Sequence, residues 1–213
     1  MNKNYINLKI WAIPAVSLII AAVSLLFLPN QIPMQWDSSG NAQMASRYTI
    51  LLIPAIGAFV LLMGRIVPVI DPKREAYGQM AKEYSIIHLL VMLLLLAVEL
   101  FVIVSSMGVD LNPLMFGYIA AGVLLAAIGN YLPKLPQTYL TGIKSIWGYH
   151  SEAVWTKIHR MAGKLWFFGG LALIVLAFIP MGFPVNLVVI AVLVISPRLY
   201  GMAVSVRMQK NKS

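Results

Sequence analysis

The sequence predicts an all-α integral membrane protein with about six transmembrane helices, and its composition is the first reason. Apolar residues make up 60% of the 213 residues and only 11% are charged, whereas soluble domains carry roughly a quarter charged residues. The mean hydropathy is +0.83. Two further observations, the length of the apolar runs and the placement of the basic residues, support the same class and argue against a soluble enzyme.

Six apolar runs are long enough to cross a hydrocarbon core of about 30 Å at about 1.5 Å per residue. The first follows Lys3 and Lys9 but lacks the small-residue cleavage pattern of a signal peptide, so it is predicted to be a retained helix. A tight turn at Pro180–Pro184 predicts that the last two runs form an antiparallel helical hairpin. The predicted spans are residues 10–28, 48–70, 85–107, 113–131, 165–183 and 184–200.

The basic residues predict the orientation. If the N-terminus is cytoplasmic, Arg47 is the one residue among the 16 Lys and Arg that lies in an outer segment. Because Lys and Arg are retained on the cytoplasmic side during insertion, both termini are predicted to be inside. The layout divides into a two-helix N-terminal module, residues 1–70 with the outer loop 29–47, and a four-helix membrane domain, residues 71–213 with the inner loop 132–164.

The outer loop contains a rigid segment that is suited to recognition. Prolines stiffen it, and the sequence from Asp37 to Gly40 reads Asp-Ser-Ser-Gly, which supplies turn chemistry. Pro33, Trp36, Asp37 and Gly40 are therefore candidate binding residues for an extracytoplasmic ligand. The alternative interpretation is that Trp36 anchors the chain at the membrane interface, as tryptophan commonly does.

The inner loop ends in a predicted amphipathic helix that runs into the fifth span. Ser151 can cap this helix, and Glu152 falls in its first turn. At 100° per residue, one face collects Trp155, His159, Ala162 and Trp166, and the opposite face collects Lys157, Arg160 and Lys164. Two interpretations stay open: a helix that lies on anionic lipid, or a basic docking surface for a cytoplasmic protein, to which Lys144 would contribute.

Glu99 lies well inside the third predicted span, where an ionisable group costs several kcal/mol unless it is paired, protonated or in contact with water. It is either a proton or ion site or a structural residue that bonds to a neighbouring helix. His88 and Asn130 lie towards the inner side of their own spans, so the sequence identifies no partner for Glu99.

No pattern in the sequence predicts catalysis, a metal centre or a cofactor. The chain has no cysteine, and the spacing of His150, Glu152 and His159 does not place the three side chains on one helical face. A nucleophile with a neighbouring base and a phosphate-binding glycine motif are also missing. The net charge of +9 follows from the inner loops and does not call for direct binding of nucleic acid.

Two stretches of the sequence carry a recognisable pattern. The stronger consists of Gly129, Asn130, Tyr131, Leu132, Pro133, Lys134, Gly142, Trp147, Trp155, His159, Arg160, Gly163 and Trp166. In order and spacing it resembles the G-N-Y-L-P-K, G-I-[RK], W and W-x-x-x-H-R-x-x-G signature of the SdpI family of bacterial immunity and signalling membrane proteins. The weaker stretch, residues 28–40, is similar to the L-P-x-x-I-P-x-H-W-D-x-x-G module that commonly precedes this signature.

The resemblance implies a multipass protein of the bacterial cytoplasmic membrane that protects a producer cell against a secreted toxin peptide. In the signalling form of the family, the toxin-occupied protein also sequesters a small winged-helix repressor at the membrane. The resemblance implies neither catalysis nor a cofactor. Two alternatives remain: a small transporter or channel that uses Glu99 as an intramembrane carboxylate, and a membrane enzyme for which no nucleophile is evident.

Overall fold

The computed structural model describes residues 5–179 and 183–210 and confirms an all-α membrane protein with one small antiparallel hairpin. The elements are α1 (Ala12–Ser24), β1 (Gln31–Trp36), β2 (Ala42–Ser46), α2 (Leu52–Ile70), α3 (Ala76–Gln79), α4 (Ala81–Ser106), α5 (Pro113–Tyr131), α6 (Ile146–His150), α7 (Glu152–Leu176) and α8 (Phe183–Lys210). A short 3₁₀ helix precedes α1 at Leu8–Trp11, another precedes α2 at Arg47–Leu51, and a third follows α5 at Leu132–Lys134.

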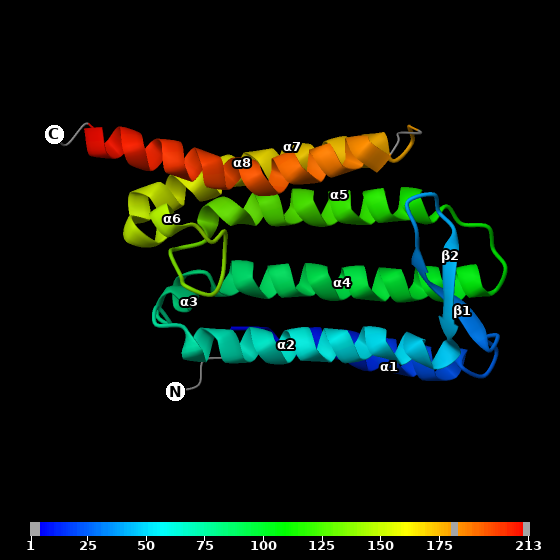
Figure 1. The fold of residues 1–213 in the computed structure, drawn as a ribbon. Helices are drawn as coiled ribbons and strands as arrows, with labels where there is room; N and C mark the ends of the chain where they lie inside the picture. Colours follow the sequence, from blue (N-terminus) through cyan, green and yellow to red (C-terminus); the bar gives the residue numbers. More distant parts are fainter. Residues whose placement is uncertain (1–4, 180–182, 211–213) are drawn as a thin grey trace.

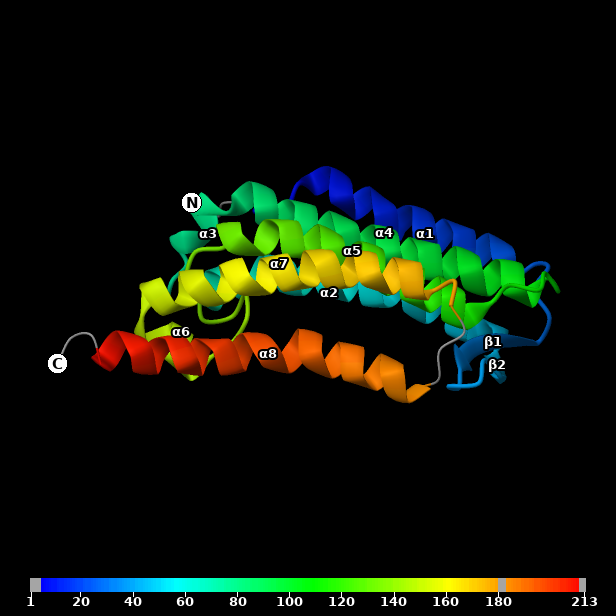
Figure 2. The same cartoon turned by 90° about the horizontal axis from the view of Figure 1, so that it is seen from above.

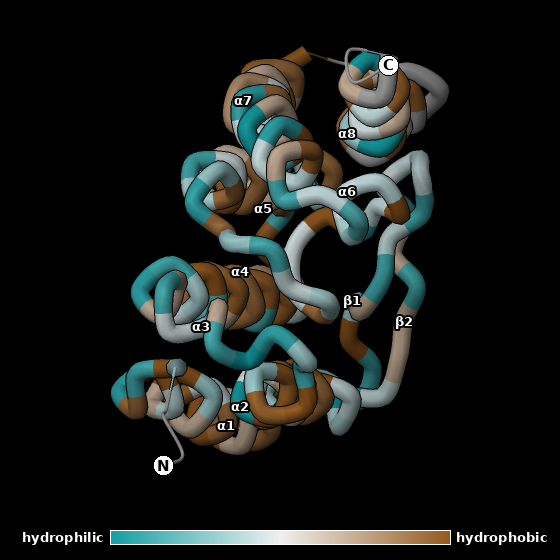
Figure 3. The backbone as a smooth tube through the Cα atoms, turned by 90° about the vertical axis from the view of Figure 1, so that its left-hand side faces the viewer, coloured by the Kyte–Doolittle hydropathy of each residue, from teal (hydrophilic) through white to brown (hydrophobic). Residues whose placement is uncertain are grey.

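The long helices run roughly side by side and form layers: α1 with α2, then α4, then α5, then α7 with α8 (Figure 1). Seen from above, α8 lies beside α7 on the side away from α1 (Figure 2), and the view along the bundle shows the same stacking (Figure 3). The end that carries Lys9, Lys73, Lys82 and Lys134 is called the basic end below. The opposite end carries the strands and is called the hairpin end.

Within the described residues, five helical segments are long and apolar enough to cross a membrane, namely Arg47–Ile70, Ala81–Ser106, Pro113–Lys134, Glu152–Leu176 and Ala191–Met208. The first predicted span is a shorter apolar helix, Leu8–Ser24. Large apolar side chains face outward from the bundle, for example Phe59, which is 59% exposed. Such side chains fit a hydrocarbon surrounding.

Several predicted boundaries are wrong. The first helix ends at Ser24 instead of residue 28, and α4 begins at Ala81 instead of residue 85. The fifth span ends at Leu176 instead of residue 183, whereas the predicted continuation of the amphipathic helix into this span is confirmed, because both form one helix from Glu152. The last helix continues beyond Tyr200 to Lys210. Part of the predicted turn at Pro180–Pro184, residues 180–182, lies outside the described residues.

The outer loop forms a β-hairpin, which the sequence analysis did not predict. Strands β1 and β2 pair antiparallel, with Gln31 opposite Ser46 and Trp36 opposite Ala42. The register shifts between Pro33 and Gln35, so Met34 forms a bulge. A bulge of this kind bends a strand and increases its twist.

Helices α5 and α7 touch through their backbones along one stripe of glycines. A Cβ atom added to Gly122 would lie 2.6 Å from the carbonyl oxygen of Gly170, and one added to Gly129 would lie 2.8 Å from that of Gly163. Small residues, glycine above all, allow membrane helices to approach so closely. Helices α4 and α5 pack less closely, and leave an apolar cavity of about 300 Å³ between Leu90, Ala97, Phe116 and Val123.

Candidate functional site

The tip of the outer hairpin is organised by Asp37. Its Oδ1 accepts the backbone N–H groups of Ser39 (2.8 Å) and Asn41 (2.9 Å), and its Oδ2 accepts the Asn41 side-chain amide at 2.9 Å. These bonds, above all the one from the Asn41 side chain, lower the pKa of the Asp37 carboxyl below its ordinary value. Gly40 takes a positive φ of 86°, which closes the turn. Asp37 and Gly40 therefore shape the tip.

Trp36 fixes the hairpin to the helices. Its ring packs edge-on against Phe101 of α4, with ring centroids 5.3 Å apart, and Phe101 in turn stacks on Phe116 of α5 at 4.2 Å. Trp36 is partly buried and packs against the buried cluster that contains Ile32, Ile50 and Val102. One side of the Trp36 ring therefore packs against α4, which holds the hairpin on the helices.

The outward surface of the hairpin contains one of the predicted residues, Asp37, and three others. Pro33 is buried and Trp36 is partly buried, whereas Gln35, Gln43 and Met44 are exposed, Met44 to 54%. Gln35, Gln43 and Met44 were not predicted as surface residues, because the strand register that turns them outward is not evident from the sequence.

At the basic end, Asp71 joins distant parts of the chain. It is the residue after α2, it is 2% exposed, and its Oδ2 accepts the backbone N–H groups of Tyr139 (3.1 Å) and Leu140 (2.8 Å). The Tyr77 hydroxyl also donates to Asp71 Oδ2 at 2.9 Å and lies 3.0 Å from Thr141 Oγ1. Burial, ahead of the nearby Asp71, raises the pKa of Tyr77 to about 12. Asp71 thus fastens the inner loop to α2 and α3.

Gln137 supports the same loop from the other side. Its amide nitrogen donates to the carbonyl oxygens of Gly148 and Tyr149, and its amide oxygen accepts a bond from the Lys73 ammonium. Lys73 also lies 3.9 Å from the carboxylate of Glu152. This contact is largely exposed on the Glu152 side, so it adds little stability. Neither Asp71 nor Gln137 was predicted from the sequence.

The predicted amphipathic helix is confirmed, and its apolar face holds the inner loop in place. Ser151 caps it by accepting the Val154 N–H at 3.4 Å. Trp155 and His159 are 1% and 0% exposed and stack with centroids 4.1 Å apart. His159 Nε2 accepts the Ile143 N–H at 3.0 Å, while its Nδ1 bonds to the Trp155 carbonyl at 2.9 Å.

This packing explains why the inner loop has a glycine at position 142. Gly142 has a φ of +96°, and a Cβ atom there would lie 2.7 Å from His159 Nε2 and 2.8 Å from the Trp155 ring. The Trp155 indole donates to the Leu135 carbonyl at 3.0 Å. Trp155 and His159, which the sequence analysis grouped with the docking residues, are therefore shielded and position the loop.

The basic side chains of the inner loop lie on the surface. Lys157, Arg160 and Lys164 are exposed along one side of α7, and Lys144 is exposed in the loop before α6. This arrangement offers a row of cations to a partner without disturbing the packed face.

The remaining motif residues build the junction of α5, α7 and α8. Gly129 and Gly163 form the close helix contact, and Leu132 is 3% exposed. The Trp166 indole donates to the Leu193 carbonyl at 2.9 Å, and Trp147 packs against the cluster of Val154, Ile158 and Val204. Asn130 is exposed, Pro133 contacts Gly163, and Lys134 lies over the ring of Tyr131 at 5.4 Å. The motif is thus mainly a packing motif.

Glu99 has a partner that the sequence analysis did not identify. It is fully buried, and the hydroxyl of Ser17 on α1 donates to its Oε2. Among the described residues, Oε1 of Glu99 has no hydrogen-bond partner. The bond from Ser17 joins α1 to α4, while His88 lies at the basic end of α4, where its Nδ1 is 2.8 Å from the Tyr84 carbonyl.

Within residues 5–179 and 183–210, no three His, Cys, Asp or Glu side chains come together in a way that would hold a metal ion. The two candidate surfaces lie at opposite ends of the bundle: the hairpin, and the exposed cations called the basic row below, Lys144, Lys157, Arg160 and Lys164.

Comparisons with known proteins match both parts of the chain. Residues 134–202, from the end of the 3₁₀ turn after α5 into α8, match the SdpI/YfhL protein family. Residues 12–58, which contain α1, the hairpin and the start of α2, match a domain of unknown function, DUF1648. Over 195 residues the chain is 25% identical to the immunity protein SdpI of Bacillus subtilis (strain 168), which covers 91% of this chain and 90% of that relative. No solved structure matches the chain. The inner loop, α7 and most of α8 are thus similar to the SdpI/YfhL protein family, and the chain as a whole is similar to one immunity protein.

Proposed function

We propose that this chain is a multipass immunity protein of the bacterial cytoplasmic membrane that protects its cell, without catalysis, against a secreted toxin peptide. The similarity to the immunity protein SdpI carries the proposal, because it extends over 91% of this chain and 90% of that protein. A bundle of membrane-length helices with an ordered hairpin at one end suits such a role.

In this proposal the hairpin is the surface that meets the peptide. Its position at the hairpin end corresponds to the outer side under the charge-based orientation. Trp36 and Asp37 hold its shape, and Gln35, Gln43 and Met44 form its exposed surface. A preformed surface loses little conformational entropy when it binds a ligand.

The test is protection of a toxin-sensitive bacterium that expresses the full chain and is exposed to secreted toxin peptides that act on the membrane. Trp36→Ala and Met44→Ser should lower the highest toxin concentration that the cells survive, while the amount of the protein in the membrane stays normal. Asp110→Asn is the matched control, because Asp110 is exposed at the same end but outside the hairpin. Failure of the wild-type chain to protect would overturn the proposal. If the hairpin variants protect as well as the wild type does, the hairpin is not the surface that meets the toxin.

We further propose that Lys144, Lys157, Arg160 and Lys164 dock a small winged-helix repressor at the membrane. All four are exposed, and the three on α7 lie opposite the packed face, so they can change without loss of the fold. Replacing Lys157, Arg160 and Lys164 by Gln should abolish recruitment of the repressor to membranes but leave protection intact. Recruitment by the wild type should also weaken as salt is added.

A charge-preserving variant with Lys157→Arg, Arg160→Lys and Lys164→Arg is the control and should still recruit the repressor. Should the triple Gln variant recruit normally, the row would instead hold α7 on anionic lipid, at about 1 kcal/mol for each charge.

A further inference from the structure

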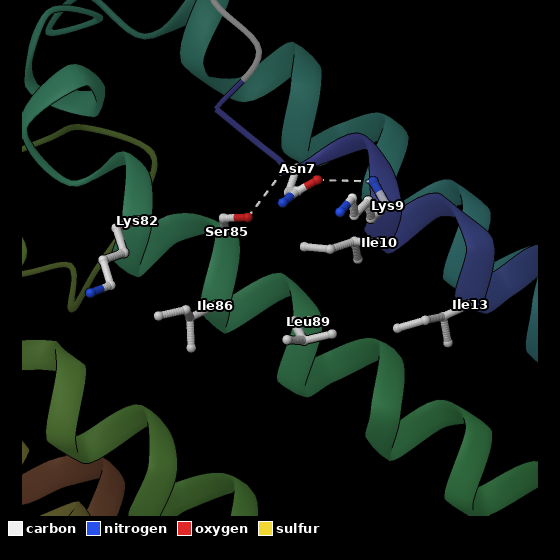
Figure 4. A pocket seen from close by; sticks show the side chains of 8 residues that line it. All are labelled: Asn7, Lys9, Ile10, Ile13, Lys82, Ser85, Ile86 and Leu89. Atoms are coloured by element: carbon white, nitrogen blue, oxygen red, sulfur yellow. Dashed lines mark hydrogen bonds between the residues drawn. The ribbon is translucent and has the colours of Figure 1, made fainter.

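A second cavity, of about 450 Å³, lies at the basic end between the start of the chain and α4. It is lined by Asn7, Lys9, Ile10, Ile13, Lys82, Ser85, Ile86 and Leu89 (Figure 4). None of these residues belongs to the hairpin, the basic row or the packed motif. Its size is within the usual range for small-molecule sites in proteins.

The polar part of the cavity is cationic. Lys9 and Lys82 are both exposed, and no ion pair is recorded for either lysine in the part of the chain that the structure describes. Ser85 Oγ accepts the Asn7 backbone N–H at 3.1 Å, which leaves the hydroxyl proton of Ser85 free to be donated to a ligand. The carboxylates of the chain do not line this cavity.

The other part of the cavity is apolar and belongs to the membrane-spanning helices. Ile10 and Ile13 come from the first helical segment, and Ile86 and Leu89 come from the first turns of α4. Figure 4 shows these four side chains together on one side of Ser85 and Asn7. A ligand that fills both parts must carry a negative group at one end and a hydrocarbon chain at the other.

A neighbouring cavity at the same end provides a contrast. It has about 470 Å³ and contains Lys73 and Arg74, but Glu75 and Glu152 line it as well. A cavity with mixed charges does not select an anion. This neighbouring cavity lies between the loops that connect the helices, so no membrane-facing side chains form a wall of it. The combination of unopposed lysines with an apolar wall is a property of the cavity that Lys9 and Lys82 line.

We propose that the cavity formed by Asn7, Lys9, Lys82 and Ser85 with its apolar wall binds an anionic phospholipid of the leaflet at the basic end. The phosphate lies between the two lysine side chains and accepts a bond from Ser85, while an acyl chain follows Ile13 and Leu89 along α1 and α4. Lysine side chains are long enough to reach a headgroup from within the interface, and basic pockets between membrane helices recognise such headgroups. The bound lipid holds the N-terminal segment against α4.

The test uses the full chain, purified in neutral detergent and freed of lipid, with thermal unfolding followed by tryptophan fluorescence. Phosphatidylglycerol, phosphatidylcholine and inorganic phosphate are titrated separately. A ligand that binds the folded state raises the unfolding temperature in proportion to its occupancy. Phosphatidylglycerol should raise it saturably, whereas phosphatidylcholine and inorganic phosphate should have little effect.

Variants then locate the site. Lys9→Gln with Lys82→Gln should weaken the apparent affinity for phosphatidylglycerol about thirtyfold, the effect of losing two contacts of about 1 kcal/mol each. Arg74→Gln with Arg207→Gln removes the same charge from exposed positions outside the cavity and should bind as the wild type does. Lys9→Arg with Lys82→Arg should also bind.

Equal stabilisation by phosphatidylcholine would overturn the proposal, because any lipid would then fill the cavity. Equal stabilisation by inorganic phosphate would overturn it as well, because the cavity would then be a simple anion site. Wild-type affinity in the Lys9→Gln, Lys82→Gln variant would also contradict it. The immunity function does not depend on any of them.

Discussion

The glycine contact between α5 and α7 allows a stability prediction with an internal control. In Gly129→Ala, the new Cβ would lie 2.6 Å from the Phe167 nitrogen and 2.8 Å from the Gly163 carbonyl oxygen. Both are backbone atoms, which cannot rotate away. Ordinary contact begins at 3.4 Å, so α7 would have to move by about 0.8 Å, and overpacking of this kind costs typically about 1–3 kcal/mol.

Gly117→Ala is the control, because Gly117 lies on the same helix and nothing lies within 4 Å of its added Cβ. Both variants gain the same helix propensity, up to about 1 kcal/mol, so their difference isolates the steric cost. At about 2–4 °C per kcal/mol for a chain of this size, Gly129→Ala should unfold about 2–12 °C below Gly117→Ala in detergent. Equal unfolding temperatures for the two variants would refute the close contact.

Two further predictions concern topology and the buried carboxyl. Reporter fusions after Met44 should read extracytoplasmic and fusions at Ser213 cytoplasmic, and a cytoplasmic signal at Met44 would contradict the charge-based orientation. Glu99→Gln should keep both protection and thermal stability, because an amide oxygen still accepts the hydrogen bond from Ser17. Glu99→Ala should lower the free energy of unfolding by about 2 kcal/mol or more, because it leaves a cavity and loses this hydrogen bond. Lost protection in Glu99→Gln at normal abundance would favour a transporter that uses this carboxyl.

The helices were predictable because each depends on local sequence. The run from Pro113 to Tyr131 matches α5 at both ends, since Asn112 caps the helix and Pro113 suits its first turn. The assignment of buried and exposed faces on α7 was also correct, because helical periodicity alone sets it. The hairpin was missed because Pro33 lies inside β1 and Met34 forms a bulge, and both features weaken the alternation that identifies a strand.

The contacts between distant segments could not be predicted from one sequence. Asp71 follows a span and precedes a proline, and nothing near it indicates that its partners are the backbone of Tyr139 and Leu140. Ionisable and amide side chains are the expected partners of a buried carboxyl such as that of Glu99, whereas the structure supplies the hydroxyl of Ser17. The outward hairpin residues became identifiable only once the strand register was known.

The loose junction between α4 and α5 has a mechanical consequence. At the hairpin end, Phe101 and Phe116 join the two helices and Trp36 attaches the hairpin to them. At the basic end, Asp71 joins α2 to the loop that follows α5. The halves are thus fastened at both ends and separated by the apolar cavity between them. Any change in the spacing of α4 and α5 would therefore alter the contacts at both ends of the bundle, those of Trp36 and those of Asp71.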